Sequence, residues 1–308
     1  MQPLDVHIHT NTGCNLQCRH CYVDAQPQTN TVIADDFEVE LISFLCRSFD
    51  ADIHLEGGEI FLEEHLIQAL NRLDDRHKKC ITITSNGTVK TSSPDTLASL
   101  RSISLLRISV EGHTDELHRK VRNCSLRTVL NNAVYYKSQG VNTAIRITLN
   151  AFNMDSMFSR VIPSLLAEGF DNFQIYEMQP VGRGLASELC ITETLDSFFE
   201  DWLAHPSPAN ITVSLPKRRL LEVKKRANAL RSIGVMHKYV GNAASVSINA
   251  LGGVTICPWD TLTEPTLRLD GSNINELLKM VEMQSVPHEC EFCSRVVLKG
   301  GRSVKANV

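Results

Sequence analysis

The 308-residue chain has no run of apolar residues approaching the ~20 that a membrane-spanning helix needs. It also lacks a marked excess of either charge, since 31 Lys and Arg residues are set against 35 Asp and Glu residues. The net charge of −4 gives no electrostatic reason to expect nucleic acid or an anionic membrane as the main partner. The first residues enter a strand-like pattern without a signal peptide. We therefore expect a cytoplasmic protein.

Solenoid-type repeats and low-complexity segments are also missing, and strand-like runs alternate with amphipathic helical runs instead. Strands are expected at 4–10, 51–56, 80–85, 104–110, 143–150 and 172–178. Helices are expected at 35–49, 62–78, 94–101, 125–138, 155–168 and 195–204. This alternation predicts an α/β fold with parallel strands. Six β/α units are too few for a closed eight-stranded barrel, so we expect an open, partial (β/α)6 TIM-like barrel.

Three segments divide the chain in this prediction. The barrel spans 1–203, and the Pro-containing "AHPSPAN" opens a linker and a basic helix at 204–235. The basic helix is explained by a solvated face, with a peptide- or phosphate-binding role as the alternative. The remaining residues, 236–308, contain a strand pair with the turn "LGG" in "SVSINALGGVTIC".

Ten cysteines do not indicate a disulfide framework in a reducing compartment, and those that are clustered indicate metal binding or catalysis. Cys46 and Cys80 fit helix and strand packing, and Cys124 and Cys190 fall in loops. The other six form an N-terminal trio and a C-terminal set: Cys14, Cys18 and Cys21, then Cys257, Cys290 and Cys293.

The N-terminal trio, in "CNLQCRHC", supplies three thiolate ligands within eight positions. A structural zinc site usually closes with four protein ligands, whereas a [4Fe–4S] cluster on three cysteines keeps one iron open. The trio follows the first predicted strand, so it lies at the end of the barrel where such folds place active sites. We therefore expect the fourth position to bind a substrate or cofactor.

This Cys-x₃-Cys-x₂-Cys spacing resembles that of the radical S-adenosylmethionine enzymes, with His20 in the usual aromatic place and Tyr22 after the third cysteine. The resemblance implies a [4Fe–4S] cluster whose open iron chelates S-adenosylmethionine. It further implies reductive cleavage to a 5′-deoxyadenosyl radical that abstracts hydrogen from a substrate. An electron donor of the flavodoxin or ferredoxin type is implied as a partner.

Further fragments similar to this family follow in order, each at the end of its own strand, and the resemblance spans about residues 5–190. In "EGGE", Gly57 and Gly58 would allow close backbone approach, and Glu59 would accept from the methionine ammonium. In "TSNGT", Ser85 and Asn86 match the ribose side of the cofactor.

The later fragments complete the cofactor contacts that the resemblance implies. Ser109 and Glu111 lie in "ISVEG", and Ser109 with Arg122 matches positions that hold the carboxylate. Asn150 ends the fifth strand, and "PVGRG" at 180–184 matches the usual neighbour of the adenine.

The C-terminal cysteines resemble the auxiliary-cluster domain called twitch in its short form and SPASM in its longer form. No cysteine follows Cys293, so we expect the short form, at 236–308 with one auxiliary [4Fe–4S] cluster. Tyr239 occupies the place of a further cysteine about eighteen residues before Cys257. Either His237 or Tyr239 completes the cluster, or one iron is open; a zinc site that adds His288 or His237 is the alternative.

The favoured function is oxidative modification or crosslinking of a ribosomally made peptide, although no leader-recognition domain is expected before residue 5. The same chemistry on an aminocyclitol or nucleotide-like metabolite is one alternative. Peptide epimerisation is another, with Cys190, or less favourably Cys124, returning a hydrogen atom.

Two functions of other classes compete with this reading. His7 and His9 would suit a metal-dependent hydrolase if both rings pointed into the barrel. A non-catalytic zinc adaptor would use six cysteines but leaves "EGGE" and the strand-end polar residues unexplained.

Overall fold

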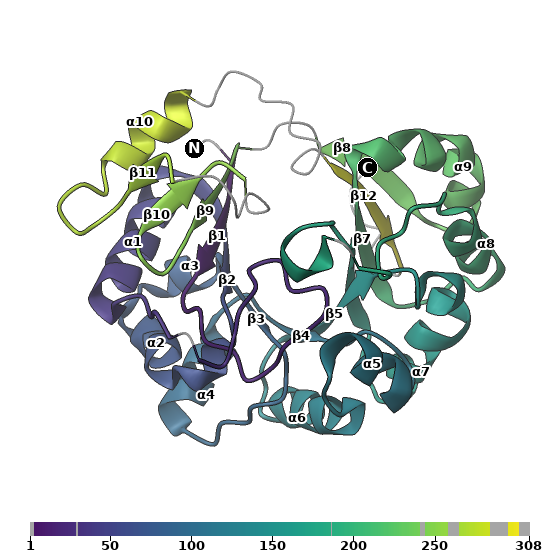
Figure 1. Ribbon diagram of the computed structural model, residues 1–308, viewed down its shortest axis with the longest axis horizontal. Coiled ribbons are helices and arrows are strands. Elements are labelled where there is room, and N and C mark those ends of the chain that lie inside the picture. Colours follow the sequence, from purple (N-terminus) through teal and green to yellow (C-terminus); the bar gives the residue numbers. More distant parts are fainter. Residues whose placement is uncertain are drawn as a thin grey trace.

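A single curved sheet of twelve strands forms the centre of the computed structural model (Figure 1). The structure describes residues 3–28, 30–185, 187–240, 244–257, 265–283 and 295–301. Eight neighbouring strands are parallel, in the order β9, then β1 to β7. They are β1 (Pro3–His9), β2 (Asp50–Glu56), β3 (Ile81–Ser85), β4 (Leu105–Ser109), β5 (Thr143–Leu149), β6 (Asn172–Glu177), β7 (Asn210–Pro216) and β9 (Ala244–Ile248).

Antiparallel strands cover both edges of this parallel set. β10 (Gly253–Thr255) pairs with β9, and β11 (Leu267–Arg268) pairs with β10. On the other side β12 (Arg295–Gly300) pairs with β7, and β8 (Met236–Val240) pairs with β12. Because β12 rather than β9 occupies the edge of β7, the sheet is an open barrel in the described part of the chain.

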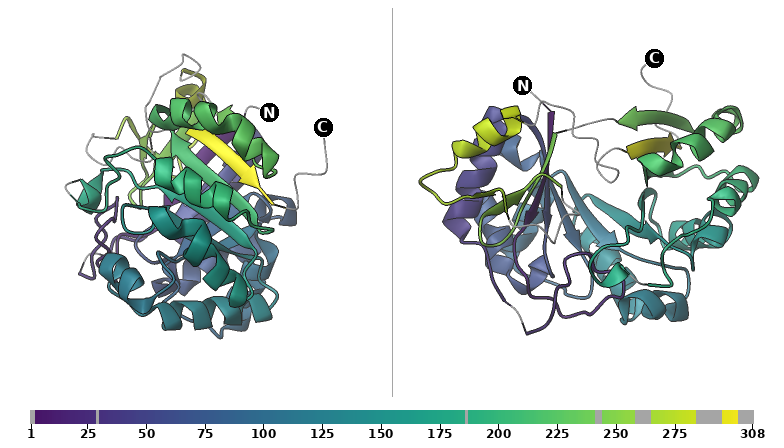
Figure 2. Two further views of the ribbon diagram at one scale, coloured as in Figure 1. Left: turned by 90° about the vertical axis from the view of Figure 1, so that its right-hand side faces the viewer. Right: turned by 45° about the horizontal axis from the view of Figure 1, so that its top comes forward.

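Helices surround the outer side of the sheet (Figure 1). They are α1 (Asp35–Ser48), α2 (Glu64–Ala69), α3 (Asp75–Lys78), α4 (Pro94–Ser102), α5 (Asp115–Arg122), α6 (Leu126–Ser138), α7 (Ile162–Ala167), α8 (Asp196–Ala204), α9 (Leu220–Ser232) and α10 (Glu276–Met283). The last of them, α10, lies beside α1 (Figures 1 and 2). No helix in the described ranges is long and apolar enough to cross a membrane.

The predicted α/β class and all six predicted strands are confirmed, each within about two residues at its ends. Two parallel strands were missed: β7 extends the set beyond β6, and β9 extends it beyond β1. The helix α5 was also missed. Its N-terminus is marked by Thr114, whose side chain accepts from Leu117 N, and by the acidic Asp115 and Glu116.

Two predicted helices are interrupted. In the range 62–78, Leu73 adopts extended backbone angles and buries its side chain, so tertiary packing overrides the local helical pattern. In the range 155–168, a π-helical turn at Met157–Val161 precedes α7. There Asp201 Oδ2 accepts hydrogen bonds from Phe158 N at 2.6 Å and Ser159 N at 3.2 Å.

The described parts of 204–308 continue the barrel sheet. The predicted linker and basic helix, 204–235, contain β7 and α9, whose Val223 and Leu230 are buried. The predicted strand pair is present as β9 and β10. Gly252 makes their turn at φ +76°, where a Cβ atom would lie 2.1 Å from Leu269 O, so glycine is required at this position.

One buried carboxyl group in this fold generates a stability prediction. Glu38 in α1 is fully buried, and its carboxylate oxygens have no hydrogen-bond partner among the residues that the structure describes. Burial, together with the nearby Asp35 charge, raises the pKa of Glu38 from 4.5 to about 8. Because the folded-state pKa is the higher one, this group stabilises the fold fully below pH 4.5, and the contribution is lost as the pH rises towards 8.

The variant Glu38→Gln should therefore gain stability relative to the unmodified protein as the pH rises. Between pH 5 and pH 7 we expect its relative free energy of unfolding to increase by about 3 kcal/mol, measured by urea denaturation at several pH values. The matched control is Glu40→Gln, an exposed position in the same helix, which should show no such trend. Parallel pH profiles for Glu38→Gln and the unmodified protein would contradict the assignment.

Candidate active site

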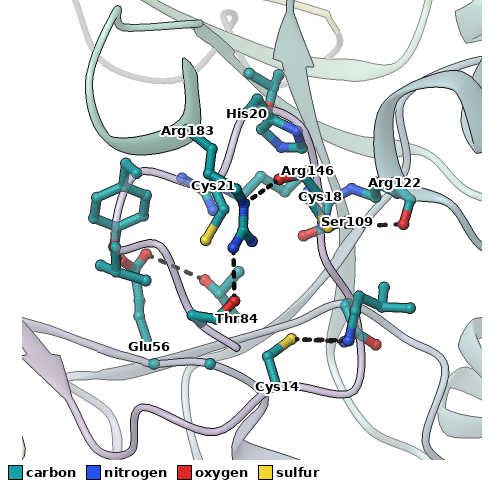
Figure 3. A pocket seen from close by; sticks show the side chains of 18 of the residues that line it. Cys14, Cys18, His20, Cys21, Glu56, Thr84, Ser109, Arg122, Arg146 and Arg183 are labelled. Carbon is teal, nitrogen blue, oxygen red and sulfur yellow. Dashed lines mark hydrogen bonds between the residues drawn. The ribbon is translucent and has the colours of Figure 1, made fainter. Parts of the chain in front are cut away.

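A cavity opens at the carboxyl ends of the parallel strands, and the three N-terminal cysteines line it together (Figure 3). They come from the loop after β1, while Glu56, Thr84 and Ser109 lie at the ends of β2, β3 and β4. This convergence follows from the topology, because the carboxyl ends of parallel strands meet at one end of the barrel.

Glycines after β2 fix the start of the cysteine loop. A Cβ atom on Gly57 would lie 2.3 Å from Asn11 Oδ1, and one on Gly58 would lie 1.8 Å from Gly13 O. Gly58 N donates to Asn11 O at 2.9 Å, and Glu59 N donates to Gly13 O at 2.8 Å. These glycines therefore allow the cysteine loop itself, rather than only a ligand, to approach the end of β2.

A second contact holds the other end of the same loop. Gly182 has φ +56°, and a Cβ atom there would lie 2.4 Å from Tyr22 O. Arg183 donates from its backbone N to Cys21 O at 3.0 Å and from Nε to Cys18 O at 2.8 Å. The "PVGRG" segment, predicted only as a neighbour of the adenine, therefore also forms hydrogen bonds with the cysteine loop.

The three thiols are arranged more widely than a mononuclear zinc site requires. Among the described residues, only Asp5, His7 and His54 bring three ligand atoms within 4.8 Å of one another. At least one pair of the trio's sulfur atoms is therefore more than 4.8 Å apart, wider than the spacing of about 3.8 Å that tetrahedral zinc bonds of about 2.3 Å impose. A wider spread suits a [4Fe–4S] cluster, in which each cysteine binds a different iron.

Hydrogen-bond donors surround two of these sulfur atoms. Leu16 N lies 3.4 Å from Cys14 Sγ, and Asn86 Nδ2 lies 3.8 Å from it. Arg122 Nη1 lies 3.8 Å from Cys18 Sγ. Burial raises the pKa of Cys18 to about 11 in spite of Arg122, so binding a metal cluster there requires release of a proton.

The predicted carboxylate-binding residues Ser109 and Arg122 both line the cavity. Arg122 is held by Glu111, whose Oε1 accepts from Arg122 Nε at 2.8 Å and whose Oε2 accepts from Thr148 N at 3.0 Å. Glu111 itself is fully buried and does not line the cavity, so its contact with Arg122 positions the guanidinium.

Glu59 also lies behind the cavity wall rather than in it. Its carboxylate accepts from Phe61 N at 3.1 Å, Ser85 Oγ at 2.8 Å and Asn86 N at 2.7 Å. Burial raises its pKa although these donors oppose the shift. Ser85 and Asn86, which were predicted to match the ribose side of the cofactor, line the cavity, and the Glu59 carboxylate accepts a hydrogen bond from each of them.

Two aromatic positions of the cysteine loop face the cavity. Tyr22 donates a short hydrogen bond to Glu56 Oε2, which lies 3.4 Å from His7 Nδ1. His20 has a buried Nδ1 without a hydrogen-bond partner, and its Nε2 lies 3.5 Å from Glu111 Oε1. Burial and Arg122 hold the pKa of His20 well below its usual value, so the ring is neutral.

Three predicted residues line neither the cavity that contains the cysteines nor the larger cavity described in the next paragraph. Asn150 is buried and stabilises the turn after β5, where its Oδ1 accepts from Phe152 N. Cys190 donates to Gly184 O at 3.3 Å, and Cys124 Sγ lies 3.3 Å from His118 Nε2. None of the three lines either cavity.

A second, larger cavity of about 560 Å³ continues down the inside of the barrel. Tyr22, Glu56, Arg146 and Tyr176 line both cavities and therefore separate them. At its far end lie Asp5 at the start of β1, its strand partner Ser245 in β9, and His237 in β8.

Cys257 is buried and follows β10, which is antiparallel to β9. This topology places Cys257 toward the amino ends of the parallel strands, opposite the N-terminal trio. The exposed Tyr239 is in β8, one residue before that strand ends. Cys290, Cys293 and His288 lie outside the described residues.

The sequence analysis missed several cavity residues that are inward members of strands. They are Thr84, Arg107, Arg146, Thr148 and Tyr176, and Glu177 joins them at the end of β6. Their signal is the alternation of polar and apolar residues in the strand sequences "LLRIS" and "TAIRITL". That signal identifies inward positions only once the strands are known to face a cavity.

The predicted hydrolase ligand pair His7 and His9 is not brought together as a metal site. The group within metal-binding distance is Asp5, His7 and His54. Arg107 Nη1 lies 3.0 Å from His54 Nδ1, so that nitrogen accepts and the proton sits on Nε2, which faces Asp5 Oδ1 at 2.9 Å. Arg295 Nη1 also lies 3.1 Å from Asp5, so the negative charge of Asp5 is balanced by the protein without a metal cation.

Comparison with known proteins identifies the superfamily of the first half of the chain. Residues 8–158 match the model of the Radical SAM superfamily. The putative peptide biosynthesis protein YydG of Bacillus subtilis is 23% identical over 200 residues, covering 63% of this chain and 60% of that protein. A probable GTP 3′,8-cyclase of Sulfurisphaera tokodaii is 22% identical over 192 residues, covering 58% of each.

Among solved structures, SuiB of Streptococcus suis, bound to its precursor peptide SuiA, has a similar fold. The TM-score is 0.64 at 14% identity, and the match covers 87% of this chain and 64% of that one. The chain thus spans about 60% of the length of the curated relatives described above. The matched segment contains the cysteine trio and the ends of β1 to β5. Residues 8–158 therefore form a radical SAM superfamily domain.

Proposed function

We propose that this protein cleaves S-adenosylmethionine reductively and uses the radical chemistry to oxidise or crosslink a ribosomally made peptide. The observation that carries the proposal is the set of three cysteines lining one cavity, next to the larger cavity of the barrel and sharing lining residues with it. When bound, a [4Fe–4S] cluster and S-adenosylmethionine supply a 5′-deoxyadenosyl radical that abstracts hydrogen.

The residues of this chain bind and orient these groups. Cys14, Cys18 and Cys21 hold three irons, while Ser109 and Arg122 bind the methionine carboxylate. Ser85 and Asn86 face the ribose, supported by the carboxylate of Glu59. Tyr22 forms the wall towards the larger cavity, where the substrate binds.

We also infer that residues 236–308 form a twitch-like unit, with an auxiliary [4Fe–4S] cluster on Cys257, Cys290 and Cys293. The fourth iron is open or is bound by His237 or Tyr239. Cys257 follows β10, which runs toward the amino ends of the parallel strands, and this direction supports a substrate held between two clusters. When bound there, the auxiliary cluster would accept an electron. A flavodoxin- or ferredoxin-type protein delivers the electron for the first cluster.

A peptide substrate is supported by the relatives named for peptide biosynthesis and by SuiB with its bound precursor peptide. A nucleotide-like metabolite is the second candidate, supported by the GTP 3′,8-cyclase relative. Epimerisation of a peptide requires a thiol near the substrate. Because Cys190 and Cys124 line neither cavity, net oxidation is favoured over it.

The cysteine trio provides the first test. Replacing Cys14, Cys18 and Cys21 by alanine should abolish formation of 5′-deoxyadenosine, because the cluster loses all three protein ligands, while some iron stays on the C-terminal cysteines. Chromatography of anaerobic reactions measures the nucleoside. Cys46→Ala, a cysteine away from both cavities, serves as the control and should keep the activity. Cleavage that persists in the triple variant refutes the cluster assignment.

Glu59→Gln tests the supporting role of the buried carboxylate. The amide brings a donor to a site already facing three donors, so stability should fall by about 1–3 kcal/mol and the affinity for S-adenosylmethionine should fall with it. Glu116→Gln, an exposed position in α5, should change neither. Weaker cofactor binding at unchanged stability would instead indicate direct contact between Glu59 and the methionine ammonium.

Metal analysis tests the auxiliary cluster. Anaerobically purified protein should contain about eight irons per chain, and Cys257→Ser should lower this towards four. Absorbance of the remaining cluster and its response to S-adenosylmethionine should be unchanged in that variant. A preparation with about four irons and one zinc would support the structural zinc site instead.

A further inference from the structure

Acidic and basic side chains divide the wall of the larger cavity. Strands β1 and β2 contribute paired inward rows, in which Asp5 is opposite Asp52 and His7 is opposite His54. The inward positions of β4 and β5 include Arg107 and Arg146 instead. Both guanidinium groups lie near the ring of Tyr176 in β6, at 5.9 Å and 5.2 Å from its centroid.

The buried acidic groups of this cavity have partners within the protein. Asp5 pairs with Arg295 at 3.1 Å, and Glu56 contacts Tyr22 and lies 3.4 Å from His7. Glu177 is bound by two arginines, Arg218 at 2.7 Å and Arg219 at 3.0 Å. These carboxylates are therefore already compensated and do not need a cationic ligand.

In the part of the chain that the structure describes, neither of the two arginines of β4 and β5 forms an ion pair with a carboxylate. Arg107 is 8% exposed, its Nη1 contacts the neutral nitrogen of His54, and its Nε is buried without a hydrogen-bond partner. Arg146 also has a buried Nε without a partner. Its charge lowers the pKa of Glu56, but no carboxylate oxygen of the described residues lies within 4.0 Å of it.

A buried guanidinium without a counter-ion is costly. Arg107 is buried and Arg146 is half-buried, and both face one cavity, where together they favour an anion. Guanidinium groups bind carboxylate and phosphate oxygens through paired hydrogen bonds. Arg146 lines both cavities, so a group bound there lies between the cysteine site and the deeper cavity.

We propose that Arg107 and Arg146 form an oxyanion subsite that binds a carboxylate or phosphate group of the substrate. The assignment of this cavity to the substrate rests on the proposed function; the anion site itself rests on the two arginines. For a peptide substrate the group is an acidic side chain near the modified residue, and for a nucleotide it is a phosphate.

Binding of small probes to the anaerobically purified holoprotein tests the subsite. N-acetylglutamate and inorganic pyrophosphate are titrated by calorimetry with S-adenosylmethionine at saturation, and N-acetylglutamine is the uncharged match. We expect one oxyanion probe to bind and the amide not to bind. Arg146→Gln should raise the dissociation constant about tenfold or more, since it removes charge-assisted hydrogen bonds.

Matched variants separate the subsite from general charge and folding effects. Arg146→Lys should retain part of the affinity, and Arg101→Gln, an exposed arginine of α4, should behave as the unmodified protein. Arg107→Gln should weaken binding as Arg146→Gln does. If Arg107→Gln fails to fold because the His54 contact is lost, Arg146→Gln still decides the outcome, since the buried Nε of Arg146 has no hydrogen-bond partner among the described residues.

Each outcome has a defined meaning. Binding of N-acetylglutamate supports an acidic peptide, while binding of pyrophosphate alone supports the subsite and a nucleotide substrate. Binding of neither probe, or binding unchanged in Arg146→Gln, overturns the subsite. So does probe binding that is seen without S-adenosylmethionine and is lost when S-adenosylmethionine is saturating, because the probe then occupies the cofactor site. Formation of 5′-deoxyadenosine is measured separately: its absence with Arg146-dependent probe binding would refute the proposed function and leave the subsite standing.

Discussion

The cysteine loop is held from two sides by glycine contacts, and the candidate active site depends on this double constraint. Gly58 permits the end of β2 to meet Gly13, where a Cβ atom would lie 1.8 Å from the carbonyl oxygen. Gly182 permits the loop after β6 to meet Tyr22, and Arg183 then binds Cys18 O at 2.8 Å. A loop fixed in this way presents its thiols in one arrangement, so little ordering remains to be done when a cluster binds.

Buried carboxylates outside the cysteine loop orient other residues of the cavity wall. Behind the cavity wall, Glu59 orients Ser85 and Asn86, while Glu111 orients Arg122. Each carboxylate accepts hydrogen bonds from backbone and side-chain donors, which offsets the cost of burying it. The deeper cavity differs. Its carboxylates are paired, but among the described residues Arg107 and Arg146 form no ion pair, which is the basis for the proposed anionic ligand.

The first six strands and the cysteine trio at their carboxyl ends were predictable from the sequence, because the hydrophobic pattern of the strands and the cysteine spacing are local signals. β7 was missed because "NITVSLP" follows a Pro-rich stretch that was interpreted as a linker, and only pairing with β6 identifies it. The position of Glu59 behind the wall was not predictable, since the motif fixes the residue but not the direction of its side chain. The position of Arg107 and Arg146 near the ring of Tyr176 likewise depends on the register of three strands that are distant in sequence.

The central claim is that the loop between its two glycine contacts holds a [4Fe–4S] cluster with one iron open to S-adenosylmethionine. Electron paramagnetic resonance of the dithionite-reduced Cys257→Ser variant isolates this cluster from the C-terminal cysteines. The account predicts a reduced-cluster signal whose g values shift when S-adenosylmethionine is added, because the cofactor becomes a ligand of the open iron. A signal that S-adenosylmethionine leaves unchanged, or no cluster signal at all, would contradict it.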